Sequence, residues 1–381
     1  MKAIIFTSEL AAYLKAASKI IPKKAVLPIL ECVHIFMADS KISFRVTDLE
    51  NELQYTTKME GNAEGSVCVP VQQLLKFVSS YKNSLIVLEY NHGDKQMSFG
   101  GFKIATQNAD DYPIKQGTLA FTGGKTIELN SSIFNQFEVA KTFLSKDELR
   151  PVMMGVLLRS KDGILTMVTT DAHRLFKEDI DEAKFDFELV VNNKASKLLK
   201  SIFQTLGDVG CGLTMEFSSN QVMFTQTNDA SSIKFCTRLT EGKYPQYDNI
   251  IPNHSIQPSK DKTQATYITV DRFELLNEIK KCSAAAPCSK QMKFSFNNNE
   301  CKIICEDIDM NSYMESSVKC RIASLFTEKG VDIGFNFLFL TELLNSITNN
   351  KVTIQISAPN RAILVRDNKR LFLQMPTILC N

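Results

Sequence analysis

The segment TTDAHRLFK, at residues 169–177, brings Asp171, His173 and Arg174 close together and is the first place to look for acid and base chemistry. A carboxylate and an imidazole can move a proton in a hydrolase when a third group orients the histidine beside a nucleophile or a water. The chain has four histidines, and the other three stand alone in the sequence. The G-x-S-x-G pattern of a serine nucleophile is missing too. We therefore expect no catalysis here and no enzyme activity.

Two other patterns that could bind a phosphate or a metal fail on their spacing. FTGGKT, at residues 121–126, ends like a phosphate-binding loop, but position 119 holds Leu119 where the motif needs glycine, so a linker is expected. The ten cysteines include no C-x-x-C pair, and Cys301 and Cys305 have no histidine close by in the sequence. The sequence predicts small buried thiols in a reducing compartment, with no metal and no cofactor.

The composition is that of a globular protein with several domains. The 381 residues are 44% hydrophobic and 23% charged, with 25 Phe and no Trp, so phenylalanine must supply most of the aromatic core. The apolar runs are far shorter than the ~18 residues of a membrane-spanning helix, and the first residues do not resemble a secretory signal. We expect a cytoplasmic protein without a membrane partner. The net charge of +2 decides nothing about nucleic acid, because binding depends on where the charges lie.

One pattern recurs three times along the chain. DDYP, GKYP and LQMP end at Pro113, Pro245 and Pro376, which are 132 and 131 residues apart. Two nearly equal intervals predict three similar domains, which we place at residues 1–121, 122–254 and 255–381. Short alternating segments such as KISFRVTD and GILTMVTTD are typical of antiparallel strands. The predicted fold class is α+β, with two helices against antiparallel sheets in each domain.

Each third also contains the signals for two helices. The first helix of each third follows a strand and a capping residue, which is Ser8, Ser131 or Ser132, and Asp271 respectively. The second helix carries two adjacent leucines, at Leu74-Leu75, Leu198-Leu199 and Leu343-Leu344. The three thirds are therefore expected to share the same order of strands and helices.

Lysines recur on these helices with the spacing of a single face. Lys15 and Lys19 are four residues apart on the first helix, and Lys194, Lys197 and Lys200 step by three on a helix of the second domain. Taken singly, each set fits a solvated face with its cations toward the end of the helix. If three domains present their helices on one side, the lysines add into a basic surface for phosphates, which binds without reading the base sequence.

Several motifs together resemble the bacterial sliding clamp family, the beta subunit of DNA polymerase III. The matching motifs, which follow the order and spacing of the family, are LPIL (27–30), TDLE (47–50), TTDAHRL (169–175), GKYPQYDNIIP (242–252), FNFLFLTELLNSI (335–347) and MPTIL (375–379). The resemblance implies a non-catalytic processivity factor. It implies that three-domain chains pair head to tail as a homodimer, in a ring around double-stranded DNA that holds the polymerase on its template.

The resemblance also implies roles for residues of the DNA contact and of the ring seam. Lys24 and Arg150 match basic positions that touch DNA in the family. Phe102 and Ile104, in the strand FKIA, match apolar positions of the seam between subunits. The facing segment KCSAAAP contributes Ser283 and Ala284.

A cleft that receives short linear peptides is a further family feature. The implied partners are the DNA polymerase III alpha subunit, the clamp loader, and other replication and repair proteins that carry clamp-binding peptides. Asn249 stands where clamps often have arginine, and Cys380 and Asn381 follow the usual terminal leucine, so a different peptide preference is expected. The matching positions of the cleft are Thr170, Ala172, His173, Arg174, Leu175, Pro245, Ile250, Met375, Pro376, Thr377, Ile378 and Leu379.

The acidic residue of the opening segment has equivalents in the other two thirds. Asp48 in VTDLENE and Asp307 in CEDIDMN occupy the same strand-to-turn position as Asp171. We therefore interpret the aspartate as part of a repeated turn, which only the middle copy extends with His173 and Arg174 to form part of a peptide pocket. The alternative is a repeat scaffold that does not bind DNA.

Overall fold

The computed structural model describes residues 2–22, 24–59, 64–82, 84–91, 95–113, 121, 124–207, 211–251, 265–323 and 330–379. The chain forms two compact units, each of which combines a terminal third with part of the middle third. Unit 1 contains residues 1–138 and 181–242, and unit 2 contains residues 139–180 and 243–381. The two predicted domain boundaries, near 122 and 255, fall outside the described residues.

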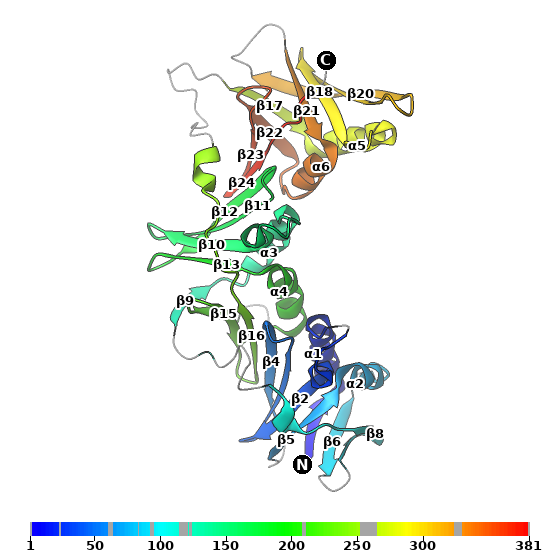
Figure 1. Ribbon diagram of the computed structural model, residues 1–381, viewed down its shortest axis with the longest axis vertical. Helices are drawn as coiled ribbons and strands as arrows, with labels where there is room; N and C mark the ends of the chain where they lie inside the picture. Colours follow the sequence, from blue (N-terminus) through cyan, green and yellow to red (C-terminus); the bar gives the residue numbers. More distant parts are fainter. Residues whose placement is uncertain are drawn as a thin grey trace. The chain divides into compact units, whose positions relative to one another are not determined.

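The elements follow one another with the predicted threefold repeat (Figure 1). The first third contains β1 (Lys2–Phe6), α1 (Thr7–Ile20), the short 3-10 helix η1 (Pro28–Glu31), β2 (Cys32–Ala38), β3 (Lys41–Thr47), β4 (Asn51–Lys58), β5 (Gly65–Pro70), α2 (Val71–Val78), β6 (Leu85–Asn91), β7 (Gln96–Phe99), β8 (Phe102–Ala105) and η2 (Ala109–Asp111). The second third contains β9 (Lys125–Leu129), α3 (Ile133–Ala140), η3 (Lys141–Phe143), η4 (Pro151–Met154), β10 (Val156–Lys161), β11 (Ile164–Thr170), β12 (Arg174–Glu182), β13 (Phe187–Val191), α4 (Asn193–Leu206), β14 (Leu213–Phe217), β15 (Gln221–Thr227), β16 (Ser231–Arg238) and η5 (Tyr247–Ile250). The third contains β17 (Thr266–Asp271), α5 (Arg272–Cys282), η6 (Ser283–Ala285), β18 (Gln291–Asn297), β19 (Glu300–Asp307), β20 (Ser312–Ala323), β21 (Val331–Asn336), α6 (Phe337–Asn345), β22 (Lys351–Ile356), β23 (Ile363–Asp367) and β24 (Arg370–Gln374). In each third, two strands lead almost directly into helices, so the predicted pair of helices per domain is confirmed.

The helix starts agree with the prediction in part. Asp271 accepts hydrogen bonds from the backbone N–H groups of Phe273 and Glu274, so it caps α5 as predicted. Ser8 does not cap α1, which begins one residue earlier at Thr7 and has no side-chain cap. The Thr7 hydroxyl instead accepts a hydrogen bond from the backbone N–H of Ser84, 2.9 Å away, and this contact fixes the start of the helix.

The sheets cross the limits of the sequence repeat. In unit 1, one sheet has the order β5-β2-β3-β4-β16-β15-β14-β9, so antiparallel pairing of β4 with β16 joins the first third to the second. A smaller sheet has the order β1-β6-β7-β8. In unit 2, the order runs β10-β11-β12-β24-β23-β22-β17-β20-β19-β18-β21, and the pairing of β12 with β24 joins the second third to the third. Adjacent repeats thus share continuous sheets, which covers the strand edges at these two joins.

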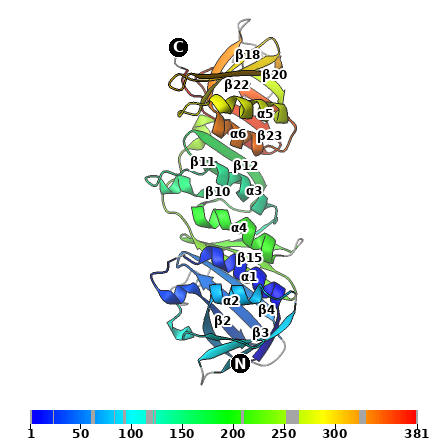
Figure 2. The same ribbon diagram turned by 90° about the vertical axis from the view of Figure 1, so that its right-hand side faces the viewer.

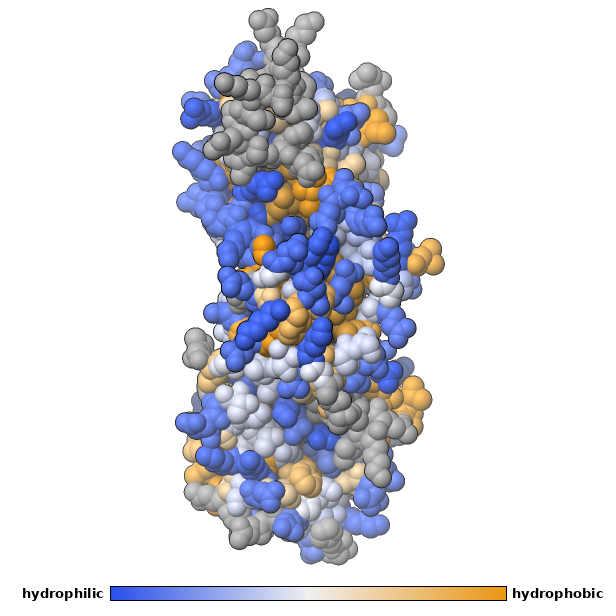
Figure 3. Space-filling view, turned by 90° about the vertical axis from the view of Figure 1, so that its left-hand side faces the viewer, coloured by the Kyte–Doolittle hydropathy of each residue, from blue (hydrophilic) through white to orange (hydrophobic). Residues whose placement is uncertain are grey.

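The helices of each unit lie against its sheet. In unit 1, α1 packs beside α2 and α4, and Figure 2 looks onto these helices with the strands behind them. Figure 3 shows the opposite side, where small groups of apolar side chains lie among polar ones. Helix α1 buries Leu10, Tyr13, Leu14 and Ala17, which is the apolar face expected from their spacing.

Phenylalanine fills the cores, as the composition predicts. Phe143, Phe176 and Phe372 are fully buried in unit 2, with ring centroids 5.4–5.8 Å apart. In unit 1, Phe134 stacks on Phe203 at 4.4 Å. Aromatic pairs in this range contribute beyond the area that they bury.

The cysteines behave as the predicted buried thiols. All nine in the described residues are free, and seven of them are buried. Burial raises the pKa of Cys32, Cys305 and Cys320 to about 11, so these thiols stay protonated and unreactive near neutral pH. No helix in the described part of the chain is long and apolar enough to cross a membrane.

Candidate functional site

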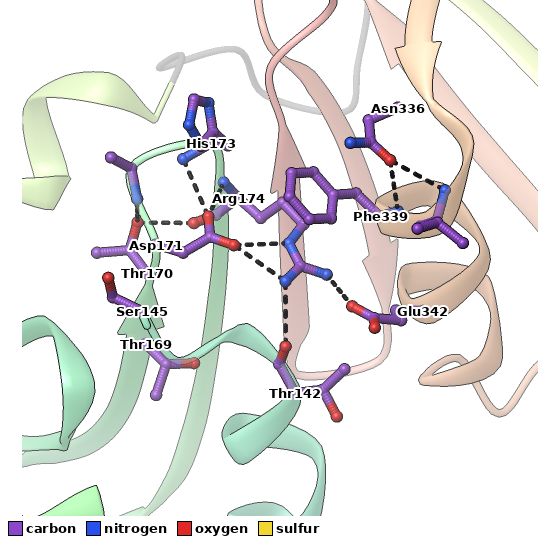
Figure 4. A network of polar contacts seen from close by, with 12 residues as sticks. Thr142, Ser145, Thr169, Thr170, Asp171, His173, Arg174, Asn336, Phe339 and Glu342 are labelled. Carbon is purple, nitrogen blue, oxygen red and sulfur yellow. Dashed lines mark hydrogen bonds and ion pairs between the residues drawn. The ribbon is translucent and has the colours of Figure 1, made fainter. Parts of the chain in front are cut away.

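The segment that contains Asp171, His173 and Arg174 forms a tight turn between β11 and β12 (Figure 4). Asp171 Oδ1 accepts hydrogen bonds from the backbone N–H groups of His173 and Arg174, at 3.0 and 2.7 Å. The Thr170 hydroxyl donates to the Arg174 carbonyl at 2.6 Å and accepts from the N–H of Ala172 at 3.2 Å. Ala172 lies in the left-handed region, with φ 73°. The carboxylate and the hydroxyl therefore hold the turn itself.

The second oxygen of Asp171 binds Arg174, whose side chain is only 5% exposed. Arg174 Nε and Nη2 lie 3.0 and 2.9 Å from Asp171 Oδ2. Arg174 Nη1 pairs with the Glu342 carboxylate on α6, and Nη2 donates to the carbonyl of Thr142 at 3.2 Å. The guanidinium thus joins three segments that lie far apart in the sequence.

Aromatic rings lie beside the same guanidinium. Its central carbon is 4.1 Å from the ring centroid of Phe339 and 5.2 Å from that of Phe143. The exposed His173 ring lies 6.2 Å from Phe339, nearly parallel to it. Phe339 and Glu342 are three residues apart on α6 and so share one helical face. Both lie in the motif FNFLFLTELLNSI, but neither was singled out individually from the sequence.

In all three thirds, an aspartate at the strand-to-turn position accepts the backbone N–H groups two and three residues later, as predicted. Asp48 Oδ1 accepts from the N–H groups of Glu50 and Asn51, and Asp307 Oδ1 accepts from those of Asp309 and Met310. Both carboxylate oxygens of Asp171 are occupied in the described contacts, so the geometry gives no support to an acid and base pair with His173. The interpretation of the aspartate as a structural residue is confirmed.

Two further segments flank the turn in unit 2. Met375 donates its backbone N–H to the His173 carbonyl at 2.8 Å, and Thr377 donates to the carbonyl of Gly334 at 2.8 Å. Gln291 Nε2 donates to the carbonyl of Ile378 at 2.6 Å, which fixes the end of the described chain.

The segment at residues 244–250 is fixed by other contacts. Burial raises the pKa of the Tyr244 phenol, and the nearby Asp171 carboxylate adds to this rise. Arg159 Nη1 lies 2.8 Å from Asp248 Oδ2 and 3.1 Å from the Tyr247 hydroxyl, which ties η5 to β10. Arg159 was not predicted from the sequence.

The predicted peptide-contact residues fall into exposed and buried groups. The exposed group, called the peptide surface below, consists of Ala172, His173, Pro245, Ile250, Met375 and Ile378. Pro376, Thr377 and Leu379 are half-buried. Thr170 and Arg174 are at most 5% exposed, and Leu175 is fully buried, so these three support the surface from below instead of forming it.

Most of the predicted DNA contacts are accessible. Lys15, Lys19 and Lys197 are exposed on α1 and α4, which pack side by side, and Lys24 is exposed after α1. Lys200 is half-buried. In unit 2, the side chain of Arg150 is 59% exposed and lies 3.5 Å from the Asp147 carboxylate.

Lys194 departs from the prediction. Its Nζ pairs with Asp48 Oδ2 and donates to the carbonyl of Ile20 at 2.6 Å, at the C-terminal end of α1. The charge is thus neutralised within unit 1, and the carbonyl that it binds is one that the helix leaves without an internal partner. We reassign Lys194 from DNA contact to support of the first turn.

The predicted seam residues differ in exposure. Strand β8 lies at the end of its sheet. Phe102 is half-buried and stacks on Phe77 at 4.4 Å, whereas Ile104 is only 3% exposed and packs inside unit 1. In unit 2, Ala284 is exposed and Ser283 is half-buried in η6.

Family models match the chain along most of its length. Residues 1–116, 128–246 and 256–374 match the N-terminal, central and C-terminal domains of the DNA polymerase III beta subunit, in that order. The beta sliding clamp of Chlamydia trachomatis is 24% identical over 391 residues, covering 99% of this chain and 86% of that protein. The beta sliding clamp of Pseudomonas putida is 24% identical over 375 residues, covering 95% of both.

Solved structures share the fold over the whole chain. The DNA polymerase sliding clamp of Pseudomonas aeruginosa, solved with a ligand, has a TM-score of 0.86 at 20% identity and covers 100% of both chains. The DNA polymerase III beta subunit of Thermotoga maritima has a TM-score of 0.84 at 20% identity, with the same coverage.

Proposed function

The chain belongs to the DNA polymerase III beta subunit family, the bacterial sliding clamps, and on that premise we propose that two copies pair head to tail in a ring around duplex DNA. A sliding clamp is a processivity factor and not an enzyme. It holds a DNA polymerase on its template because the ring encircles the duplex. The threefold repeat carries this proposal, since two chains of three similar domains supply six domains for a closed ring.

We place the DNA contact on the exposed cations of the helices and loops. Lys15, Lys19 and Lys197 lie on neighbouring helices of unit 1, and Lys24 follows α1. Lysines contact phosphates without reading the bases, so the bound ring would slide and its affinity would fall steeply with salt. Arg150 would act likewise in unit 2, weakened by its pairing with Asp147.

The seam of the ring is proposed to lie between β8 of one copy and the η6 region of the next. Phe102 presents part of an aromatic ring there, and Ile104 supports the strand from inside unit 1. Ser283 and Ala284 would face them from the other copy. A seam that pairs the free edge of β8 would also protect that edge from aggregation.

The peptide surface is proposed to bind linear peptides with apolar anchors. Ile250, Met375 and Ile378 are 52%, 42% and 88% exposed, and His173 adds a polar edge beside them. Extended peptides with a few apolar side chains fit such a mixed surface. The partners would be the DNA polymerase III alpha subunit, the clamp loader, and other replication and repair proteins in the cytoplasm.

A loading experiment on circular DNA tests the proposed ring. The protein is loaded onto a nicked circle with a clamp loader, and the circle is then cut once. A topological clamp slides off the free ends, whereas a conventional DNA-binding protein stays bound. Retention of the protein on the linear product would contradict the ring. Failure to associate with any DNA would favour the alternative, a repeat scaffold that does not bind DNA.

Charge reversal locates the DNA contact in the same assay. The double variant Lys15→Glu/Lys19→Glu should lose most of its retention on intact circles, because it reverses two neighbouring charges on α1. The matched control is Lys41→Glu/Lys58→Glu, which changes two exposed lysines that are cross-strand partners on β3 and β4. Equal losses in the two variants would contradict a specific role for the helices.

A further inference from the structure

The small sheet of unit 1 presents an apolar patch to solvent. On β1 and β6, the solvent-facing residues include Ile4 and Phe6 and, directly opposite them, Val87 and Leu85. Phe6 and Leu85 are 45% and 60% exposed, whereas the residues that alternate with these four are buried. Single exposed apolar residues are common, but two adjoining pairs form a continuous patch that marks an interaction site. We call these four residues the apolar face.

The corresponding strand pair is polar on its solvent side in the other two thirds. The third domain offers the closest comparison, because β17 leads directly into α5 and pairs with β22 just as β1 leads into α1 and pairs with β6. The solvent-facing pairs are Asp271–Lys351 and Thr269–Thr353 on β17 and β22, and Glu128–Thr214 and Thr126–Glu216 on β9 and β14. The repeated fold therefore does not require apolar side chains at these positions, which indicates a role outside the fold.

The apolar face is fixed at both ends. Beside Phe6 and Leu85, the backbone N–H of Thr7 donates to the Ser84 carbonyl at 2.9 Å, and the Thr7 hydroxyl accepts from the Ser84 N–H at 2.9 Å. At the far end, Lys2 Nζ lies 3.0 Å from Glu89 Oε1 across the same two strands. The four side chains thus lie on a fixed strand pair, which can accept a partner without first rearranging.

The exposed charges beside the apolar face are mainly positive. Lys82 precedes Leu85 by three residues, and Lys103 lies on the same side of the sheet, two strands from Glu89. Neither lysine is in an ion pair in the part of the chain that the structure describes, whereas Glu89 is already paired with Lys2. A partner that carries acidic residues beside apolar ones would complement this surface.

We propose that the apolar face binds an amphipathic helix of another protein, whose apolar stripe is flanked by acidic residues. A helix can lay such a stripe across the face of a sheet, as helices do inside domains. The proposal goes beyond the ring and concerns a surface separate from the peptide surface, which lies in unit 2.

Two other occupants fit the apolar face less well. A stable dimer buries about 1,200–2,000 Å² in total, which is more than four side chains can supply, so a second copy of the chain is disfavoured. An anionic membrane gains only about 1 kcal/mol from each nearby lysine, and two unpaired lysines are too few to hold the protein there.

Fluorescence anisotropy with the full chain tests the proposal. The probe is a labelled peptide of about 18 residues, or about five helical turns, that places leucine and alanine on one face and glutamate on the other. A peptide with lysine in place of glutamate tests the role of charge, and the parent should bind it more weakly than the acidic peptide.

Two variants copy the polar pairs of the third domain into the first. Phe6→Asp/Leu85→Lys should weaken binding of the acidic peptide at least about tenfold, and Ile4→Thr/Val87→Thr should weaken it about threefold. Because the third domain carries the same pairs in the same register, both variants should unfold thermally like the parent.

The matched control is Phe36→Asp/Ser66→Lys. Phe36 is 46% exposed, and Ser66 is its cross-strand partner in the other sheet of unit 1. This variant introduces the same two charges away from the apolar face, so it should bind the acidic peptide like the parent.

Three kinds of result would overturn the proposal. The first is a parent that does not bind the acidic peptide or binds both peptides equally, and the second is a pair of folded variants that bind it like the parent. The third is an activity of the parent that Phe6→Asp/Leu85→Lys loses, either binding to phosphatidylglycerol vesicles or self-association, which would assign the apolar face to a membrane or to a second copy. Retention on DNA circles tests the ring separately and should be unchanged in this variant.

Discussion

The turn at residues 47–51 and the turn at residues 170–174 share a backbone and differ in what surrounds it. In both, a threonine hydroxyl bridges the turn, an aspartate accepts two backbone N–H groups, and the residue after the aspartate has φ near 75°, at 77° and 73°. The first turn ends in Asn51, which is fully buried and binds Asp48 and Thr237. The second ends in Arg174.

The difference shows how a repeated structural motif is specialised. In the first turn, the counterion of the aspartate is Lys194 from α4, and the whole network stays within the fold of unit 1. In the second turn, the counterion is Arg174 of the turn itself, and its remaining donors reach Glu342 and the carbonyl of Thr142. His173 is left exposed beside Met375. The repeat supplies a turn with a defined backbone, and the three residues after the aspartate, which differ between the two copies, give it different surroundings.

The largest expected difference between the turns is in stability. Arg174→Ala removes a cation that is only 5% exposed and that also binds Glu342 and the Thr142 carbonyl, and should cost about 3–5 kcal/mol in unit 2. Lys194→Ala should cost about 1 kcal/mol in unit 1, because Lys194 is 39% exposed and Asp48 keeps its bonds to the turn. Urea unfolding followed by hydrogen exchange reports the two units separately. If Arg174→Ala and Lys194→Ala lowered the free energy of unfolding equally, the buried cation would contribute no more than the half-exposed one, against our expectation.

Acid should destabilise unit 1 through a histidine that lies close to the first turn. His34 stacks on Tyr112, whose hydroxyl accepts the N–H of Thr47, and burial together with Arg45 lowers the pKa of His34 from 6.5 to about 4. The folded-state pKa is the lower one, so the unfolded chain takes up the proton more readily and stability falls as the pH drops from 6.5 to 4. The loss should reach about 3 kcal/mol at most.

Unfolding measured against pH checks this expectation. His34→Phe keeps an aromatic ring against Tyr112 and should flatten the pH dependence of unit 1 between pH 7 and 4. The control is His173→Ala, which removes a histidine of unit 2 and should leave the slope of unit 1 as in the parent. An unchanged slope in His34→Phe would show that another group titrates.

The smallest expected effect concerns peptide binding and tests the specialisation directly. His173→Ala should weaken the binding of a labelled linear peptide from the polymerase alpha subunit about fivefold, which corresponds to about 1 kcal/mol of binding free energy. Fluorescence anisotropy measures this affinity. Glu50 occupies the same position in the first turn and supplies the matched control, since Glu50→Ala should leave the affinity unchanged. If His173→Ala also leaves it unchanged, the second turn does not contribute its histidine to the peptide surface.

Much of the fold could be predicted from the sequence because its signals are local. Three such signals are the proline-ended segments, the paired leucines of the second helices and the cap at Asp271. Each depends on a few neighbouring residues, so it can be recognised without a structure. The structural role of Asp171 was accessible for the same reason, since its main hydrogen bonds reach two and three residues along the chain. The start of α1 was missed because Thr7 is fixed by Ser84, a residue 77 positions away.

The sequence alone determined the repeat, the helices, the buried thiols and the repeated acidic turn, because hydrophobic spacing and short-range hydrogen bonds specify them. Only the tertiary structure decided which cations remain available and which side chains reach the surface. Lys194 and Lys197 look alike on one helix, yet one lies against an aspartate 146 residues away and the other is exposed. Arg174 pairs with Glu342, which lies 168 positions later in the sequence. Such partners depend on how distant segments pack, so they cannot be predicted from a local sequence pattern.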